Sequence, residues 1–387
     1  MRRVKQHGHQ LTEVARFRLK PAMTATRIDV NLGSRSYPIF VGDQILTKVG
    51  ELITSAMDAT HAVVITDSNV GPLYLEICQR VLEDQGMRVN AVTVPAGETT
   101  KSLPYAEQLW NALVDFHADR KTVVVALGGG VVGDLAGFIA ATFARGLRLV
   151  QIPTSLLAQV DSSVGGKVGI NLEKAKNMVG AFHQPSLVVI DVGTLRSLPQ
   201  REYISGLAEV VKYGVILDAQ FFEFLEHNVP AILNVDPAIL TSIIARCCRL
   251  KADVVEADER EETGYRAILN YGHTFAHAFE TLTNYTSLLH GEAVAIGMTC
   301  AARLAASRNM FSSDECKRQT DLLRVLGLPT EPPNLSPHDV LACMRHDKKV
   351  QHGQLRLILP KRLGQVELVA DVDPGEITAV LAPLQTN

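Results

Sequence analysis

The chain has 387 residues, of which 47% are apolar and 20% are charged, so it is long enough to form two domains of ordinary size with substantial hydrophobic cores. Its formal net charge of -3 gives no general attraction to nucleic acid or to an anionic membrane, so a phosphate group would need a local cluster of Lys and Arg. The six cysteines show no C-x-x-C spacing, which disfavours a zinc ribbon or a disulfide framework and favours a reducing cytoplasm.

Residues 1–25 are predicted to be a basic, disordered N-terminal extension. The first 22 residues contain six Lys or Arg and one acidic residue, and they lack the apolar segment of a secretory signal. A start codon wrongly assigned upstream of Met23 would explain these residues equally well. The alternative is that they form an anion-binding arm. The longest apolar run, 122–144, is interrupted by glycines and Asp134, so it predicts a strand, a loop and a helix, not a membrane span.

Residues 26–200 are predicted to form an α/β domain with an open, mostly parallel, nucleotide-binding sheet. Two short segments within 28–41, in which apolar and polar residues alternate, predict a small hairpin. Apolar runs that predict strands then alternate with segments of helical periodicity. The expected strands are 61–66, 89–94, 122–127, 147–152 and 187–190, and the expected helices are 73–85, 105–116 and one that begins near residue 132.

Four polar or glycine-rich loops follow strands of this predicted sheet, at 67–69, 97–101, 128–134 and 153–155. Ligands of open α/β sheets bind at the carboxyl ends of the strands, and glycines allow backbone N–H groups to approach a pyrophosphate. A nucleotide is therefore the expected ligand. The pattern is not the G-x-G-x-x-G fingerprint, and one glycine-rich turn can be purely structural, so the prediction depends on the convergence of four loops.

Residues 161–183 are predicted to form a long functional loop, because they are polar and glycine-rich and show no regular period. Lys167, Lys176 and Asn177 are candidates for binding phosphate and carboxylate groups. The alternative is that these lysines are ordinary solvated side chains. Beyond Pro199 the pattern becomes helical, so residues 201–387 are predicted to form a mainly α-helical domain, with helices at 237–256, 267–281, 292–306 and 314–326 and a strand pair at 355–359 and 365–369.

The predicted helical domain contains groups that bind divalent metals. If 267–281 is one helix, His273 and His277 lie one turn apart on the same face, a geometry in which two imidazoles reach one zinc ion. Glu209 and Lys212 likewise share a helix face. A histidine pair at this spacing is also common on surfaces and in cores. Spacing alone does not select the three ligands from the candidates Glu209, His273, His277 and His290.

Taken together, these segments resemble the 3-dehydroquinate synthases, which are sugar phosphate cyclases. The resemblance extends from about residue 27 to the C-terminus. It rests on the motifs Pro-Ala-Gly-Glu-Thr-Thr-Lys101, Gly-Gly-Gly-Val-Val-Gly-Asp134, Ile-Pro-Thr-Ser-Leu-Leu-Ala-Gln-Val-Asp-Ser-Ser-Val-Gly-Gly-Lys167, Gly-Leu-Ala-Glu-Val-Val-Lys-Tyr-Gly214, Asn-Tyr-Gly-His-Thr-Phe-Ala-His277 and His-Gly-Glu292. Val168, Ala276 and His183 depart from the family pattern.

The resemblance implies the following site residues. One divalent metal, zinc or cobalt, would be held by Glu209, His273 and His290, and His277 would contact the substrate instead. NAD would be contacted by Asp67, Asn69, Ala96, Gly97, Glu98, Thr99, Thr100, Lys101, Gly129, Gly130, Val131, Val132, Gly133, Asp134, Thr154, Ser155, Asp161, Lys167, Lys176, Thr194, Leu195, Arg196 and Ser197. The substrate would be contacted by Lys167, Lys212, Asn177, Arg266, Asn270, His277, Lys348, Lys349 and, across a homodimer, Arg145.

The activity implied by the resemblance is the second step of the shikimate pathway, which leads to the aromatic amino acids. 3-Deoxy-D-arabino-heptulosonate 7-phosphate would be converted to 3-dehydroquinate and phosphate by transient oxidation with NAD, phosphate elimination, re-reduction, ring opening and aldol closure. One alternative is another sugar phosphate cyclase, which would differ around Arg266, Asn270 and Lys348. The other is a metal-dependent polyol dehydrogenase, which would release NADH and would need fewer groups for binding oxyanions.

Overall fold

The computed structural model describes residues 25–173, 175–284, 286–346 and 355–381. Nearly all of the predicted N-terminal extension, together with Lys348 and Lys349, lies outside these residues. No helix within the described ranges is both long and apolar enough to cross a membrane. Run 122–144 instead forms a strand and a helix, as the interrupting glycines indicated.

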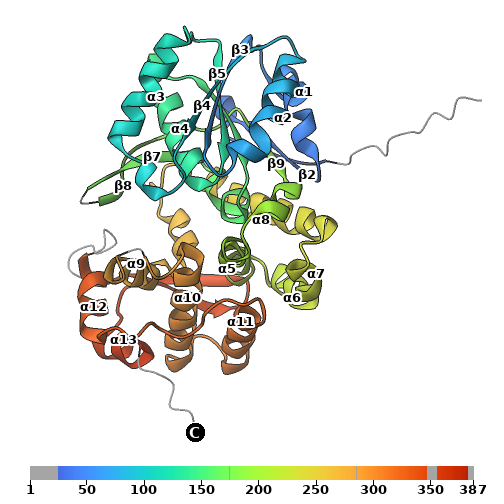
Figure 1. The fold of residues 1–387 in the computed structure, drawn as a ribbon. Coiled ribbons are helices and arrows are strands. Elements are labelled where there is room, and N and C mark those ends of the chain that lie inside the picture. Colours follow the sequence, from blue (N-terminus) through green and yellow to red (C-terminus); the bar gives the residue numbers. More distant parts are fainter. Residues whose placement is uncertain (1–24, 174, 285, 347–354, 382–387) are drawn as a thin grey trace, which may run out of the picture.

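A seven-stranded sheet organises the first half of the chain (Figure 1). The strand order is β1-β2-β9-β6-β5-β3-β4. Only the pairing of β1 with β2 is antiparallel, so the predicted hairpin and the mostly parallel sheet are both confirmed. The strands are β1 (Thr26–Val30), β2 (Tyr37–Gly42), β3 (His61–Asp67), β4 (Arg88–Val94), β5 (Thr122–Gly128), β6 (Arg148–Pro153) and β9 (Leu187–Asp191).

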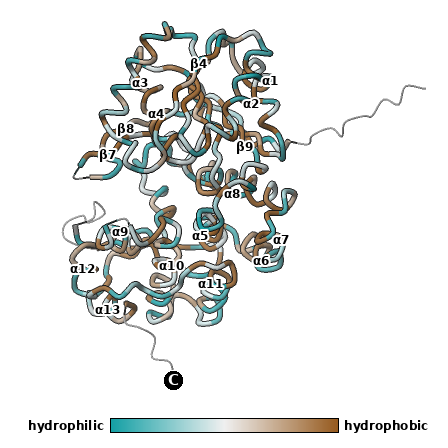
Figure 2. Tube along the Cα trace, in the orientation of Figure 1, coloured by the Kyte–Doolittle hydropathy of each residue, from teal (hydrophilic) through white to brown (hydrophobic). Residues whose placement is uncertain are grey.

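Helices cover both faces of this sheet. Strands β5 and β9 are buried along their whole length, which explains their continuous apolar sequences. Figure 2 shows hydrophobic residues gathered in the central strands and polar residues on the outer helices. One face packs against α1 (Val49–Ala56) and α2 (Gly71–Glu83), and the other against α3 (Leu103–Asp115) and α4 (Gly130–Thr142).

The second half of the chain is mainly helical, as predicted. Its largest core cluster continues into the sheet, because α8 packs against β1 and β2 and helps to cover that end. Helices α5 and α8 lie between the sheet and the remaining helices (Figure 1). The elements are α5 (Gln200–Leu217), α6 (Ala219–His227), α7 (Val229–Leu233), α8 (Pro237–Ala257), α9 (His273–Leu282), α10 (His290–Ser307), α11 (Ser313–Val325), α12 (Pro337–His346), β10 (Leu357–Arg362), β11 (Gln365–Val369) and α13 (Pro374–Leu381).

The predicted single helix over 267–281 is wrong. The chain forms a 3₁₀ helix at Tyr265–Asn270 and then begins α9 at His273. Gly272, between them, has a φ of 79°, a left-handed conformation that ends a right-handed helix. A Cβ on this glycine would lie 2.8 Å from the backbone nitrogen of Met298, so the close approach of α10 also requires glycine.

The predicted long loop over 161–183 is also wrong. Its first residues end a π-helical turn (Ala158–Ser162), and most of the remainder is a hairpin of β7 (Lys167–Leu172) and β8 (Ala175–Phe182). A Cβ on Gly169 would lie only 2.6 Å from the carbonyl oxygen of Val179 on the opposite strand. The glycines therefore reflect tight packing between strands, which hides the alternation expected of a strand.

Candidate metal and nucleotide site

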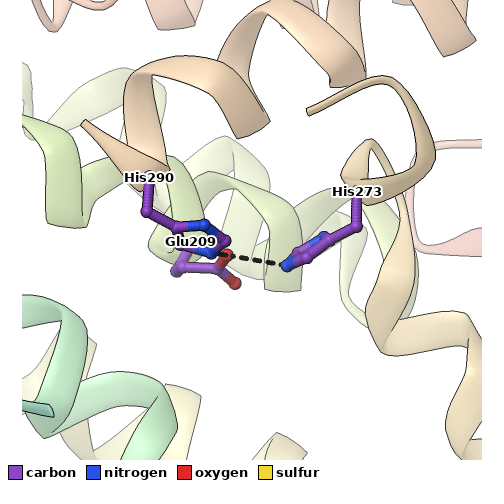
Figure 3. A group of neighbouring side chains, drawn as sticks. All are labelled: Glu209, His273 and His290. Carbon is purple, nitrogen blue, oxygen red and sulfur yellow. Dashed lines mark ion pairs between the residues drawn. The ribbon is translucent and has the colours of Figure 1, made fainter. Parts of the chain in front are cut away.

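Three helices bring together one carboxylate and two imidazoles. Glu209 comes from the middle of α5, His273 is the first residue of α9, and His290 is the first residue of α10 (Figure 3). One potential ligand atom from each residue lies within 4.8 Å of those of the other two. These are the three metal ligands that the family resemblance implied. His277 lies outside this group, with its ring centroid 5.8 Å from that of His273.

Neighbouring acceptors orient both imidazoles. Nδ1 of His273 lies 3.1 Å from the carbonyl oxygen of Tyr271, and Nδ1 of His290 lies 3.3 Å from a carboxylate oxygen of Glu280. Donation from Nδ1 leaves the lone pair on Nε2. The Nε2 atoms lie 3.5 and 3.7 Å from Oε1 of Glu209. Both lone pairs therefore face the carboxylate across a space in which a cation would bind.

The environment of Glu209 fits a metal ligand. The residue is fully buried, and its Oε2 forms an ion pair with Nζ of Lys212. Neither carboxylate oxygen has a well-directed hydrogen bond from any part of the chain that the structure describes. A buried carboxylate is costly without such bonds. One Glu and two His are also a ligand set of catalytic zinc sites that keep a fourth position open.

The charge around His290 also favours a cation. Burial lowers the pKa of His290, but the carboxylates of Glu209 and Glu280 outweigh this effect and raise the pKa to about 10. Glu280 is itself buried, and its pKa is lowered because its hydrogen bond to His290 and the nearby positive charge outweigh burial. The two carboxylates thus create a negative potential at the imidazole that a divalent ion would also neutralise.

A cluster of charged groups, in which Lys251 is buried and Asp161 is half-buried, adjoins this site. Nζ of Lys251 donates to a carboxylate oxygen of Asp161 at 2.8 Å, and the hydroxyl of Tyr213 donates to the same oxygen at 2.7 Å. Burial raises the pKa of Asp161, but Lys251 and Lys212 outweigh it and hold the pKa well below its usual range. Burial also lowers the pKa of Lys251. The sequence reasoning missed Lys251, although a lysine among the buried residues Cys247, Cys248, Leu250 and Ala252 of one helix was a usable signal.

Two further cations, Lys167 and Arg266, lie beside the carboxylate of Glu261. Arg266 is 3% exposed, and its guanidinium donates to the carbonyl oxygens of Glu259 at 2.7 Å and Gly165 at 3.3 Å. Glu261 forms an ion pair with Lys167, and the same carboxylate oxygen lies 3.7 Å from Nε of Arg266. Sequence reasoning missed Glu261, which lies between two expected substrate-binding cations. Asn270 ends the 3₁₀ helix that contains Arg266.

The predicted nucleotide loops meet at the carboxyl ends of the strands, which form the nucleotide edge of the sheet. The register pairs Asp67 with Val94 and Gly128 with Pro153, so these parallel strands end at the same level. Asp67 accepts hydrogen bonds from the backbone nitrogens of Asn69 and Val70, and Nζ of Lys101 lies 2.6 Å from a carboxylate oxygen of Asp134. The remaining expected NAD residues on this edge follow β4 (Ala96, Gly97, Glu98, Thr99, Thr100), begin α4 (Gly129, Gly130, Val131, Val132, Gly133), follow β6 (Thr154, Ser155) or follow β9 (Thr194, Leu195, Arg196, Ser197).

The glycines at this edge fit a bound pyrophosphate. A Cβ on Gly129 would lie 3.4 Å from the Ser155 hydroxyl, and one on Gly130 would lie 3.1 Å from the Ser162 hydroxyl. Both glycines are half-buried, so the backbone at the N-terminus of the 13-residue helix α4 is partly exposed and an anion can reach it. Asp161, Lys167 and Lys176 were also expected to contact NAD, but they come from the π-helical turn and the β7–β8 hairpin instead of this edge.

Comparisons with known proteins agree with this geometry. A family model described as 3-dehydroquinate synthase N-terminal matches residues 91–205, and one described as 3-dehydroquinate synthase C-terminal matches residues 206–350. The 3-dehydroquinate synthase of Desulforamulus reducens is 51% identical over 356 residues, which are 92% of this chain and 99% of that protein. The chain belongs to the 3-dehydroquinate synthase family. The expected resemblance is thereby confirmed.

Solved structures of related cyclases share the whole fold of this 3-dehydroquinate synthase family member. A 2-deoxy-scyllo-inosose synthase complexed with carbaglucose-6-phosphate, NAD⁺ and Co²⁺ has a TM-score of 0.84 and 28% identity, covering 92% of this chain and 99% of its own. A 2-epi-5-epi-valiolone synthase from Streptomyces hygroscopicus subsp. jinggangensis, with NAD⁺ and Zn²⁺ bound, has a TM-score of 0.82 and 27% identity, covering 97% and 98%.

The glutamate of the family's His-Gly-Glu292 motif stabilises the helix end that carries His290. Glu292 accepts a hydrogen bond from the backbone nitrogen of Leu289 at 2.8 Å, and Nε and Nη2 of Arg201 on α5 donate to its two oxygens at 2.7 and 2.8 Å. Glu292→Ala should therefore lower the free energy of unfolding by about 1–2 kcal/mol in urea titrations at pH 7.

This stabilisation should also depend on pH. Burial raises the pKa of Glu292, but the hydrogen bonds from Arg201 and Leu289 outweigh it, so the pKa is lowered from its ordinary value of 4.5. The advantage over Glu292→Ala should be complete above that value and should shrink as the pH falls through the lowered pKa. Arg201→Gln, which leaves the hydrogen bond to Leu289 in place, should cost less. Equal stability of wild type and Glu292→Ala at pH 7 would contradict the capping role.

Proposed function

We propose that this chain is a 3-dehydroquinate synthase that converts 3-deoxy-D-arabino-heptulosonate 7-phosphate to 3-dehydroquinate and phosphate. The observation that carries the proposal is the proximity of the cluster of Glu209, His273 and His290 to buried lysines. Membership of the family and the identity of about half of the residues with a 3-dehydroquinate synthase support the same substrate. The metal, zinc or cobalt, would be held by these three residues.

Two bound groups would supply chemistry that side chains lack. NAD would supply reversible hydride transfer, and a metal held by Glu209, His273 and His290 would supply Lewis acidity for the hydroxyl to be oxidised. The residues implied by the resemblance at the sheet edge are proposed to hold NAD, and 26–200 and 201–387 are proposed as the nucleotide-binding domain and the metal- and substrate-binding domain.

The chain's own cations would bind the two anionic ends of the substrate. Burial lowers the pKa of Lys212, but Glu209 and Asp161 outweigh it and raise the pKa, so its Nζ stays protonated and can neutralise a carboxylate. Lys167 and Arg266 are proposed to bind the phosphate, in place of the Glu261 carboxylate that lies between them. Neutralising the phosphate stabilises it as a leaving group, and a site built only for oxidation would have no need of these cations.

We also propose a homodimer in which Arg145 completes the partner's substrate site. Arg145 follows α4 and precedes β6, at the edge of the sheet opposite to the nucleotide loops, and its φ of 68° holds it in an exposed left-handed turn. Strand β8 exposes Met178, Val179 and Phe182, an uncharged surface that favours pairing with another chain.

Because all six cysteines are free thiols, we propose a cytoplasmic location.

The proposal predicts that NAD is required but not consumed. Enzyme, zinc, the heptulosonate phosphate and less than one equivalent of NAD per substrate should be mixed, and the absorbance of NADH and the free phosphate should be followed together. Since the hydride returns after phosphate has left, many phosphates should be released per NAD without steady accumulation of NADH. NADH that rises in step with product would instead identify a polyol dehydrogenase. Phosphate release with a product other than 3-dehydroquinate would identify another cyclase.

A further inference from the structure

Asn171, near the end of β7, makes three polar contacts with two other parts of the molecule. Its backbone nitrogen donates to the carbonyl oxygen of Lys101 at 2.8 Å, and its side-chain Nδ2 donates to a carboxylate oxygen of Glu98 at 2.8 Å. Its Oδ1 accepts a hydrogen bond from the backbone nitrogen of Asn177 at 2.9 Å. The side chain is therefore anchored at both ends, and neither partner is adjacent to it in sequence.

The contact with Asn177 lies at an irregularity of the hairpin. The register pairs Ile170 with Val179 and Leu172 with Ala175, so one residue of β7 faces the three residues 176–178 of β8. Asn177 has a φ of 54°, a left-handed conformation that is rare in strands. A bulge of this kind turns side chains away from the positions they would take in a regular strand, and it persists only where other contacts stabilise it. The hydrogen bond from Asn177 to Asn171 is such a contact.

The contacts with Glu98 and Lys101 connect the same residue to the nucleotide edge. Both residues belong to the loop after β4, and Nζ of Lys101 is in turn 2.6 Å from the Asp134 carboxylate on α4. Asn171 thus connects the loop that meets α4 with the bulge that carries Lys176 and Asn177. The two ends of its side-chain amide therefore contact Glu98, an expected NAD contact, and Asn177, an expected substrate contact.

We propose that Asn171 is a positioning residue that holds the NAD-binding loop and the substrate-binding bulge in register. This inference rests on the proposed function, because it takes Glu98 and Lys101 as NAD contacts and Asn177 as a substrate contact; of the two anionic groups for which Asn177 is a candidate, we assign it the phosphate. The side chain acts through its neighbours. Its Nδ2 orients Glu98 for NAD, and its Oδ1 keeps Asn177 in the left-handed conformation for phosphate.

Two substitutions separate the two ends of the amide. Asn171→Asp keeps an oxygen that accepts from the Asn177 nitrogen, but it places a carboxylate against Glu98. Asn171→Ala removes both hydrogen bonds. Each lost bond to a charged or strained partner corresponds to about a tenfold loss of affinity. We expect Asn171→Asp to weaken NAD about tenfold and to change phosphate affinity less than about twofold, whereas Asn171→Ala should weaken both about tenfold.

The affinities should be measured by calorimetry on the full-length, zinc-loaded protein, with NAD and then with inorganic phosphate on the NAD-saturated protein. Binding needs no turnover, so this result stays interpretable even if the chain has another activity. The KM values for NAD and the sugar phosphate should show the same division where turnover occurs. Zinc content and melting temperature should match the wild type for Asn171→Asp, which keeps the bulge bonded.

A rescue provides the control. Glu98→Gln added to Asn171→Asp restores a donor and an acceptor with their roles exchanged, so the double variant should bind NAD as well as Glu98→Gln alone. A positioning role predicts the divided response and this rescue. Equal weakening of NAD and phosphate by Asn171→Asp, no weakening by either variant, or an effect only on melting temperature would overturn the proposal.

Discussion

Glu209→Ala should lose the bound metal and turnover together. The substitution leaves two neutral imidazoles to hold a dication, and an anionic oxygen ligand is the largest electrostatic contribution to such a site. Metal content should fall to near zero by elemental analysis after dialysis, and phosphate release should fall with it by several orders of magnitude. Full metal content in the purified variant would contradict the assignment of Glu209 as a ligand.

The same substitution leaves a buried cation without its partner. Lys212 is 1% exposed and forms an ion pair with Glu209, and removing one member of such a pair costs about 3–5 kcal/mol. Unfolding must therefore be followed alongside metal content. Adding Lys212→Met should restore much of the stability but no metal, which separates the ligand role from the structural one.

His277→Ala is the matched control for the metal site. His277 is one helical turn from His273 but is not part of the three-residue group. The variant should keep its metal and lose turnover, because the resemblance places His277 on the substrate. Loss of metal would favour the ligand pair that the spacing of the two histidines originally suggested.

Gly291→Ala should separate His290 from the other ligands. A Cβ on Gly291 would overlap the carbonyl oxygen of Ser205 on α5, and the Gly291 nitrogen already donates to the Ser205 hydroxyl at 3.1 Å. Alanine normally stabilises a helix by about 1 kcal/mol relative to glycine. Here the helices must move apart, so a net loss of about 2 kcal/mol in unfolding free energy is expected, with at least about tenfold weaker zinc binding.

Gly42→Ala is a suitable control for this variant. A Cβ on Gly42 would find its nearest atoms at 3.6 to 3.8 Å, which is ordinary packing contact. Its stability and its zinc affinity in a competition titration with a chelating dye should match the wild type. A Gly291→Ala protein that is as stable and binds zinc as tightly would mean that α5 and α10 are not held in close contact.

Local patterns in the sequence were sufficient to predict the fold class. A strand that is buried on both faces, such as β5, has a continuous apolar sequence, and a strand that is buried on one face, such as β1 or β2, alternates apolar and polar residues. Both patterns can be recognised from neighbouring residues alone. The family, and with it the candidate site residues, followed from long motifs. The roles of individual residues within the site stay predictions.

Patterns also failed where a distant segment decides the local conformation. Gly272 ends the predicted helix because α10 packs closely against it, and Gly169 belongs to a strand because it faces the Val179 backbone. Neither reason is visible within a window of neighbouring residues. Periodicity reports which faces are buried, but it does not report what buries them.

Residue patterns thus predicted the parallel sheet, its polar loops and the residue types able to bind metal, nucleotide and phosphate, and the family resemblance implied the metal ligands. Spacing alone left His277 as a candidate ligand, and the fold groups Glu209 with His273 and His290 without it. The pairing of Lys251 with Asp161 across 90 residues was found only in the folded chain. Hydrophobic periodicity is a property of neighbouring residues, whereas helix ends and the pairing of charges depend on distant segments that only folding brings into contact.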